Sequence, residues 1–153
     1  MPRRSDPLTR DQHRKIGKDL FNYTWTLLDK KRRTQAETEE MIHAAHASRH
    51  HWGRAGTPVN FSIGEWQLSR VYSVLGRWEP ALYHGRRALE IARRRKLGRF
   101  YLAYAYEALA RAEAVAGQRR ARDRYLSEAR RLSPTIRDRD DRRMLLDDLA
   151  TIP

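Results

Sequence analysis

The stretch that decides the fold is residues 62–95, SIGEWQLSRVYSVLGRWEPALYHGRRALEIARRR. Apolar residues recur in it every three or four positions, which is the period of one face of an α-helix. Gly76 interrupts this pattern, and the Glu-Pro pair at 79–80 restarts it, because proline is favoured in the first turn of a helix. The stretch therefore predicts two helices, at about 58–75 and 79–96, that are antiparallel neighbours across a short turn.

Capping signals extend this pattern over the rest of the chain. Thr34 with Glu37 three residues later forms a capping box, and the Thr-Pro and Ser-Pro pairs at 57–58 and 133–134 each place a capping residue before a proline. The further helices expected lie at about 8–29, 35–53, 100–116, 119–131 and 134–149. We therefore predict one all-α domain, residues 1–153, built as a stack of about seven antiparallel helices. Residues 1–7 are expected to be a flexible tail, and residues 134–150 a helix that caps the stack.

Composition excludes several classes of protein. The chain has 153 residues and no cysteine, so it is neither a disulfide scaffold nor a cysteine-ligated metal protein. No apolar run approaches the ~18 residues that a membrane span needs, and the N-terminus has no apolar segment typical of a secretory signal. A soluble cytoplasmic protein that does not bind membranes is expected.

Residues 62–95 resemble a tetratricopeptide repeat (TPR), which places Leu, a small residue and Tyr on its first helix, Gly at the turn and Ala on its second helix. The residues that carry the resemblance are Leu68, Ser69, Tyr72, Gly76, Trp78, Ala81, Leu82, Ala88 and Leu89. A weaker copy contains Tyr104, Leu109, Ala110, Gly117, Leu126 and Ala129. Gly85 and Glu65 depart from the pattern, because the family usually has an aromatic residue at the first position and often Trp at the second. The match is good over about 62–132 and weak elsewhere. It implies a TPR-like superhelix of stacked hairpins that acts as a binding module or adaptor.

In this family the first helix of each hairpin lines a concave groove that binds a peptide. The positions that correspond here are Ile63, Trp66, Gln67, Arg70, Ser73, Tyr104, Glu107 and Arg111. Arg70 and Arg111 could each bind a carboxylate through a guanidinium fork, so the expected partner is an acidic protein or peptide. In the alternative interpretation, Trp66 and Tyr104 only pack against the terminal helices of a short array.

An excess of arginine suggests a second function, the binding of a nucleic acid or another polyanion. The net charge is +13, and 27 of the 32 basic residues are arginine. The expected helices 79–96 and 119–131 would be neighbours on the convex side and would present a basic patch there. That patch contains Arg86, Arg87, Arg93, Arg94, Arg119, Arg120 and Arg124. In the alternative interpretation, the excess is compositional, and Glu90 and Glu128 neutralise part of it.

A histidine cluster suggests a third function, the binding of a metal or a small ligand. His43, His46 and His50 lie within about 60° of one another on a helix, and Glu39 shares that face. Two imidazoles four residues apart can bind one divalent metal, which is the only cofactor that the sequence suggests. In the alternative interpretation, the histidines are exposed or fill polar gaps between helices, with His84 as a neighbour.

Motifs for catalysis are missing. The chain has no phosphate-binding glycine loop, no nucleophile elbow, no dinucleotide fingerprint and no isolated pair of carboxylates. The sequence therefore favours a binding protein over an enzyme, as a monomer or a homodimer.

Overall fold

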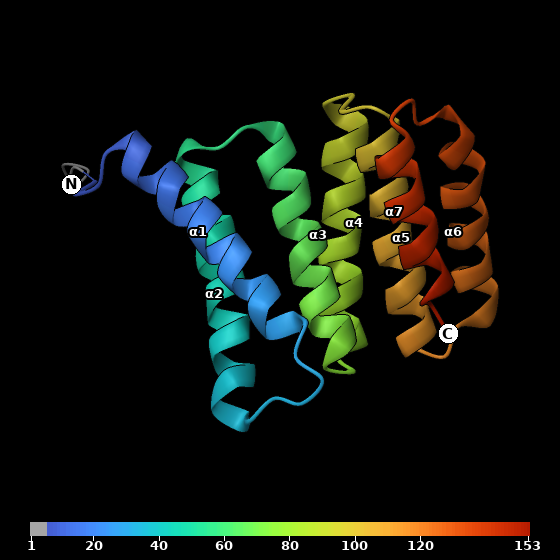
Figure 1. Ribbon diagram of the computed structural model, residues 1–153, viewed down its shortest axis with the longest axis horizontal. Helices are drawn as coiled ribbons and strands as arrows, with labels where there is room; N and C mark the ends of the chain where they lie inside the picture. The colour runs from blue at the N-terminus through green and yellow to red at the C-terminus, as the bar shows by residue number, and fades with distance from the viewer. Residues whose placement is uncertain (1–5) are drawn as a thin grey trace.

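The computed structural model describes residues 6–153, which form seven α-helices, one 3₁₀ turn and no strand (Figure 1). The elements are α1 (Arg10–Leu28), α2 (Gln35–Ala55), α3 (Pro58–Val74), α4 (Trp78–Arg94), α5 (Arg99–Val115), α6 (Arg119–Leu132), η1 (Ser133–Thr135) and α7 (Arg139–Ala150). The most extensive packing joins α1 to α2, α3 to α4 and α5 to α6, while α4 also packs on α5 and α3 on both α2 and α5. The predicted all-α stack of antiparallel helices is confirmed.

Reciprocal capping boxes fix the beginnings of the first three helices. The hydroxyls of Thr9, Thr34 and Thr57 each accept a hydrogen bond from the backbone N–H three residues later. In each case the side chain at that third position accepts one from the threonine N–H. Each box satisfies two of the N–H groups that a helix end leaves unpaired. The predicted helix starts after Thr34 and Thr57 are therefore confirmed.

The start predicted for the last helix, at the Ser-Pro pair 133–134, is wrong. Those residues form the 3₁₀ turn η1, and α7 begins at Arg139. Asp138 provides the cap, because its side chain accepts hydrogen bonds from the backbone N–H groups of Asp140 and Asp141. An aspartate cap followed by two further acidic residues fits the positive end of a helix better than the serine does.

One turn conformation occurs twice in the stack. Gly76 and Gly117 both have a φ of 73°, a left-handed conformation that glycine adopts without steric cost. After each, the next N–H donates back into the preceding helix, from Arg77 to the Tyr72 carbonyl and from Gln118 to the Glu113 carbonyl, both at 2.9 Å. The α3–α4 and α5–α6 hairpins therefore end their first helices in the same way.

Fully buried small residues let the helices pack closely. Ala81, Ala88 and Ala103 have no exposed surface, and two apolar clusters run through the stack, one centred on α2–α4 and one on α5–α7.

Of the predicted tail, residues 1–5 lie outside the described part, whereas Asp6 accepts hydrogen bonds from Arg54 on α2. No helix within residues 6–153 is both long and apolar enough to cross a membrane.

Candidate functional site

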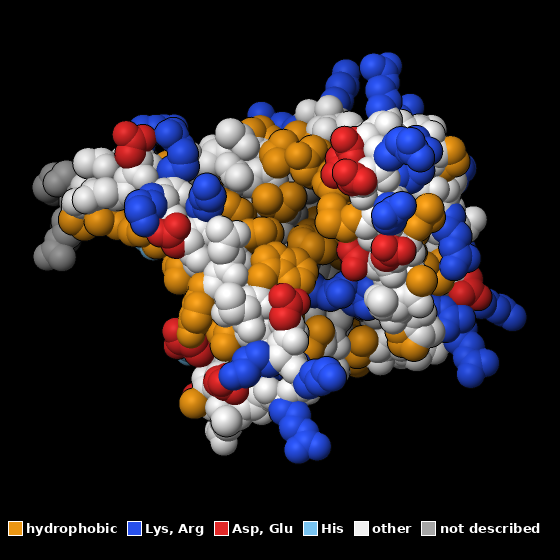
Figure 2. Space-filling view, viewed as in Figure 1, with side chains coloured by type: hydrophobic (Ala, Val, Ile, Leu, Met, Phe, Trp, Pro, Cys, Tyr) orange, Lys and Arg blue, Asp and Glu red, His pale blue; other side chains and the backbone are white. Residues whose placement is uncertain are grey.

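A hollow of about 390 Å³ opens between α1 and α7, on the face that Figure 2 shows with an apolar centre. Its floor comes from α3 and α5. Six of its lining side chains are aromatic: Phe21, Trp25, Trp66, Phe100, Tyr101 and Tyr104. We call this hollow the aromatic groove. Its volume lies within the range of about 300–1,000 Å³ typical of ligand pockets.

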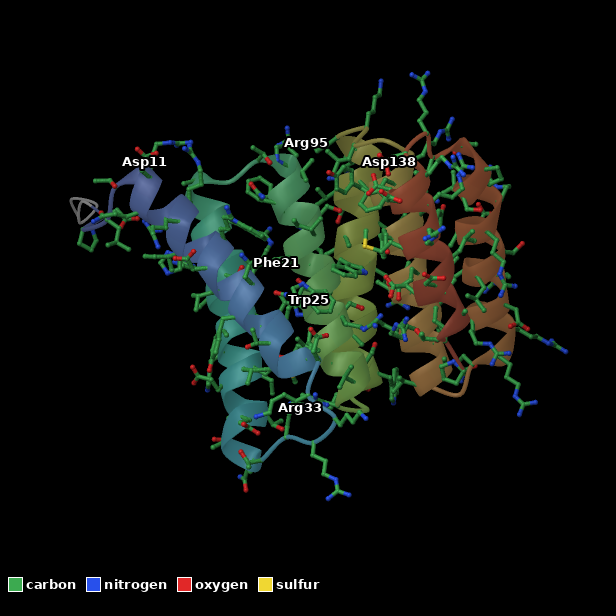
Figure 3. All side chains as sticks on the ribbon, viewed as in Figure 1. Asp11, Phe21, Trp25, Arg33, Arg95 and Asp138 are labelled. Atoms are coloured by element: carbon green, nitrogen blue, oxygen red, sulfur yellow. The ribbon has the colours of Figure 1, made fainter. Side chains whose placement is uncertain are left out.

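The rings of the aromatic groove pack on one another across three helices. The ring centroid of Trp66 on α3 lies 5.5 Å from that of Trp25 on α1 and 5.3 Å from that of Tyr104 on α5. Phe100 packs on Tyr104 at 4.9 Å. Figure 3 shows Phe21 and Trp25 on the side of α1 that faces α3. Mutual ring packing fixes the side-chain rotamers, so the groove wall exists before anything binds.

A buried ionic cluster lies next to the groove. Glu107 has no exposed surface, and its carboxylate accepts hydrogen bonds from Trp66 Nε1 at 2.8 Å, Arg70 Nη1 at 3.0 Å and Arg111 Nε at 2.8 Å. Burial lowers the pKa of the Arg70 guanidinium, and Glu107 opposes that shift. Both arginines, expected to be free for an acidic partner, are instead paired with a carboxylate of their own chain.

Asp148 on α7 is the charged residue that lines the groove itself. The Tyr104 hydroxyl donates to its Oδ2 at 2.7 Å. Burial and this carboxylate raise the pKa of Tyr104, so the hydroxyl stays a neutral donor. Arg111 Nη2 donates to the Asp148 carbonyl at 3.0 Å and to Thr151 Oγ1 at 2.9 Å. These bonds hold the α7 wall against α5.

The eight predicted groove residues divide into three groups. Arg70, Glu107 and Arg111 form the buried ionic cluster. Ile63, Trp66 and Tyr104 line the groove. Gln67 and Ser73 are buried away from it, and Gln67 Nε2 donates to the Phe21 carbonyl at 2.9 Å. The lining residues that the sequence did not indicate are Phe21, Trp25, Ser62, Phe100, Tyr101, Ala105, Met144 and Asp148.

The arginines of the predicted basic patch lie on α4 and α6, which flank a shallow hollow of about 260 Å³ over α5. Arg87 and Arg94 both pair with Glu90, and Arg93 donates to the Tyr106 hydroxyl. Four of the seven are exposed and make no ion pair with residues 6–153: Arg86, Arg119, Arg120 and Arg124. Binding of a polyanion here stays a prediction.

The structure does not gather His43, His46 and His50 into a metal site. Within residues 6–153 no three His, Asp or Glu side chains lie close enough to hold a metal ion. His46 Nε2 is hydrogen-bonded to the Tyr72 hydroxyl at 2.8 Å, and its ring packs on His84. His50 packs on His51 instead. His46 therefore contributes to a polar contact between α2, α3 and α4, the alternative left open by the sequence.

Glu65, a departure from the repeat pattern, lies in that same polar contact. Its carboxylate is 3.0 Å from Arg49 Nε and 2.7 Å from His84 Nδ1. Burial disfavours its ionised form, but the hydrogen bonds and charges of His84 and Arg49 hold the pKa of Glu65 below its usual range. A separate contact between two histidines, His13 and His51, joins α1 to α2, with their Nδ1 atoms 2.7 Å apart.

Lowering the pH is expected to destabilise the fold through His46 and His51. Burial lowers the pKa of both imidazoles, and neighbouring imidazoles lower it further. The unfolded state, with a pKa of about 6.5, therefore takes up protons first. The contribution of these two neutral histidines to the free energy of unfolding is therefore complete above pH ~6.5 and is lost as the pH falls below that value. Urea unfolding between pH 8 and pH 5 should show a falling midpoint, and the double variant His46→Gln/His51→Gln should flatten that slope. An equal slope in the variant would contradict this assignment.

No protein-family model, curated protein or solved structure matches this chain. The resemblance to a repeat family therefore rests on the sequence of residues 62–132. The functional interpretation rests on the side chains of the aromatic groove.

Proposed function

We propose that this protein is a TPR-like interaction module whose aromatic groove binds a segment of a partner protein. The observation that carries the proposal is the set of six aromatic side chains around one open hollow. Buried aromatic side chains are the most frequent anchors of protein interfaces, because they offer a large apolar area with few rotatable bonds.

Preorganisation of the groove supports this proposal. Gln67 holds the backbone of α1 at Phe21, while Tyr104 and Arg111 hold α7 at Asp148. Both walls are thus attached to the floor by hydrogen bonds. Because the side chains of the groove are already ordered, they lose little conformational entropy when a partner binds. Such a loss is otherwise a major cost of association.

The partner expected from the groove differs from the acidic protein or peptide expected from the sequence. Arg70 and Arg111 donate to Glu107, so an acidic partner would have to compete with a buried carboxylate for them. Apolar contact with Trp25, Trp66 and Ile63 is the stronger source of affinity. We therefore propose a partner segment that binds through apolar anchors rather than through acidic side chains.

Filling the groove with a longer side chain should abolish partner binding. Ile63→Arg replaces a lining residue by a longer side chain that occupies the groove and excludes the partner. Tyr83→Arg is the matched control. Tyr83 is 61% exposed on α4, so this variant adds the same charge outside the groove. Quantitative affinity capture from cells that express the protein should recover the same partners with the wild type and Tyr83→Arg. Recovery should fall at least tenfold with Ile63→Arg. Equal recovery by all three proteins would refute the proposal.

A further inference from the structure

We propose that the aromatic groove receives a cationic side chain of the partner, an ammonium or guanidinium group on an aliphatic stem. This inference rests on the proposed function and specifies the chemistry of the bound segment. It reverses the sign of the partner charge expected from the sequence. Two features of the groove carry it, the aromatic faces and the carboxylate of Asp148.

The aromatic lining suits a cation with an apolar stem. Trp25, Trp66 and Tyr104 lie in ring contact, with Phe100 beside Tyr104. The face of an aromatic ring is electronegative and attracts a cation, most strongly where water is excluded and most strongly of all for tryptophan. Aliphatic carbons next to the charge meet the same rings as apolar surface. Aromatic cages of this kind are the usual means of binding alkylated ammonium groups.

Asp148 selects the sign of the charge. Its Oδ2 accepts from Tyr104, and its Oδ1 has no hydrogen-bond partner among residues 6–153. Any occupant of the groove removes this carboxylate from part of its water. A neutral occupant does not compensate the charge of the carboxylate, and an acidic occupant adds repulsion between like charges. A cation provides the opposite charge, so it compensates the lost hydration best.

The charges around the groove do not cancel this preference. Arg70 and Arg111 both form ion pairs with Glu107 and, among residues 6–153, none with the Asp148 carboxylate, so these four side chains together carry no net charge. The net charge of +13 acts mostly from a greater distance, where salt screens it over a Debye length of about 8 Å. The aromatic rings and the Asp148 carboxylate, which line the groove, therefore determine which charge is favoured inside it.

Choline and its uncharged carbon isostere 3,3-dimethylbutan-1-ol test the charge at nearly constant shape. An NMR titration can follow the indole N–H signals of Trp25 and Trp66, with Trp78 on α4, outside the groove, as an internal reference. Choline should bind at least fivefold more tightly than the alcohol. Asp148→Asn should remove most of that preference, while Asp147→Asn, next to it on α7 but outside the lining, should keep it.

A pair of peptides distinguishes a partner side chain from a free amine. A short peptide with lysine between leucines should bind more tightly than the same peptide with norleucine in place of lysine. If choline binds and neither peptide does, the ligand is a small free ammonium compound, and the proposal of a side chain from a partner protein is wrong. If the neutral probes bind as well as the cations, the cation proposal fails while the proposed interaction groove stands. If no probe moves the Trp25 and Trp66 signals, both proposals fail.

Discussion

Replacing Glu107 by glutamine is expected to lower the free energy of unfolding by about 3–5 kcal/mol, the usual effect of removing one partner from a buried ion pair. Glu107 is fully buried, while the side chains of Arg70 and Arg111 are 18% and 11% exposed. Without the carboxylate, two largely buried guanidinium groups repel each other and lose their common acceptor. Urea unfolding at pH 7 measures the loss directly.

Two controls separate this effect from the loss of any ion pair. Glu90→Gln removes an exposed carboxylate that pairs with Arg87 and Arg94, and should cost at most about 1 kcal/mol. The triple variant Arg70→Met/Glu107→Leu/Arg111→Leu replaces the buried cluster by apolar side chains, so it should recover part of the stability lost in Glu107→Gln. Similar small losses for Glu107→Gln and Glu90→Gln would show that Glu107 is not the buried centre of charge described here.

The hairpins were predictable because their determinants are local. Gly76 ends one helix through its own backbone conformation, and Thr34 and Thr57 begin others through atoms three residues away. The start of α7 was missed for a reason that is also local. The Ser-Pro pair at 133–134 and Asp138 compete as helix starts five residues apart, and the sequence alone does not rank them.

The groove was predictable only where the repeat pattern assigns a position. Ile63, Trp66 and Tyr104 follow from that pattern, whereas Phe21 and Trp25 lie on a helix whose apolar residues surround more than one face. Helical periodicity identifies them as apolar but not as groove-facing. Their role depends on how α1 crosses α3, which is a tertiary contact.

Asp148 illustrates the same limit for a charged residue. In the sequence it follows Asp147 after three apolar residues of the last expected helix, and no motif singles it out. Its position in the groove depends on Tyr104 and Arg111, which lie 44 and 37 residues away in the chain. No spacing rule within a helix or a hairpin connects residues so far apart.

Gly17→Ala is expected to lower the free energy of unfolding by about 1–3 kcal/mol, although the same change inside a helix normally stabilises it by about 0.5–1 kcal/mol. A Cβ atom at Gly17 would lie 2.5 Å from Cδ1 of Trp52, so α1 and α2 would have to move apart. Ser48 Oγ, which donates to the Gly17 carbonyl at 2.7 Å, opposes that movement. Thermal or urea unfolding measures the change.

Gly53→Ala is the matched control, because the two glycines lie in neighbouring helices and differ in what a methyl group would meet. At Gly53 a Cβ atom would lie 3.2 Å from Nη1 at the flexible end of Arg49, so the helix-forming gain of alanine should prevail. Opposite signs for Gly17→Ala and Gly53→Ala are therefore expected, and two gains would show that α1 and α2 do not pack as closely as described. Trp52 also packs on Phe21, with ring centroids 5.1 Å apart, so Gly17→Ala should displace a groove wall as well. Loss of stability and loss of binding should then occur together in this variant, because the contact that sets the distance between the two helices also positions the first ring of the groove.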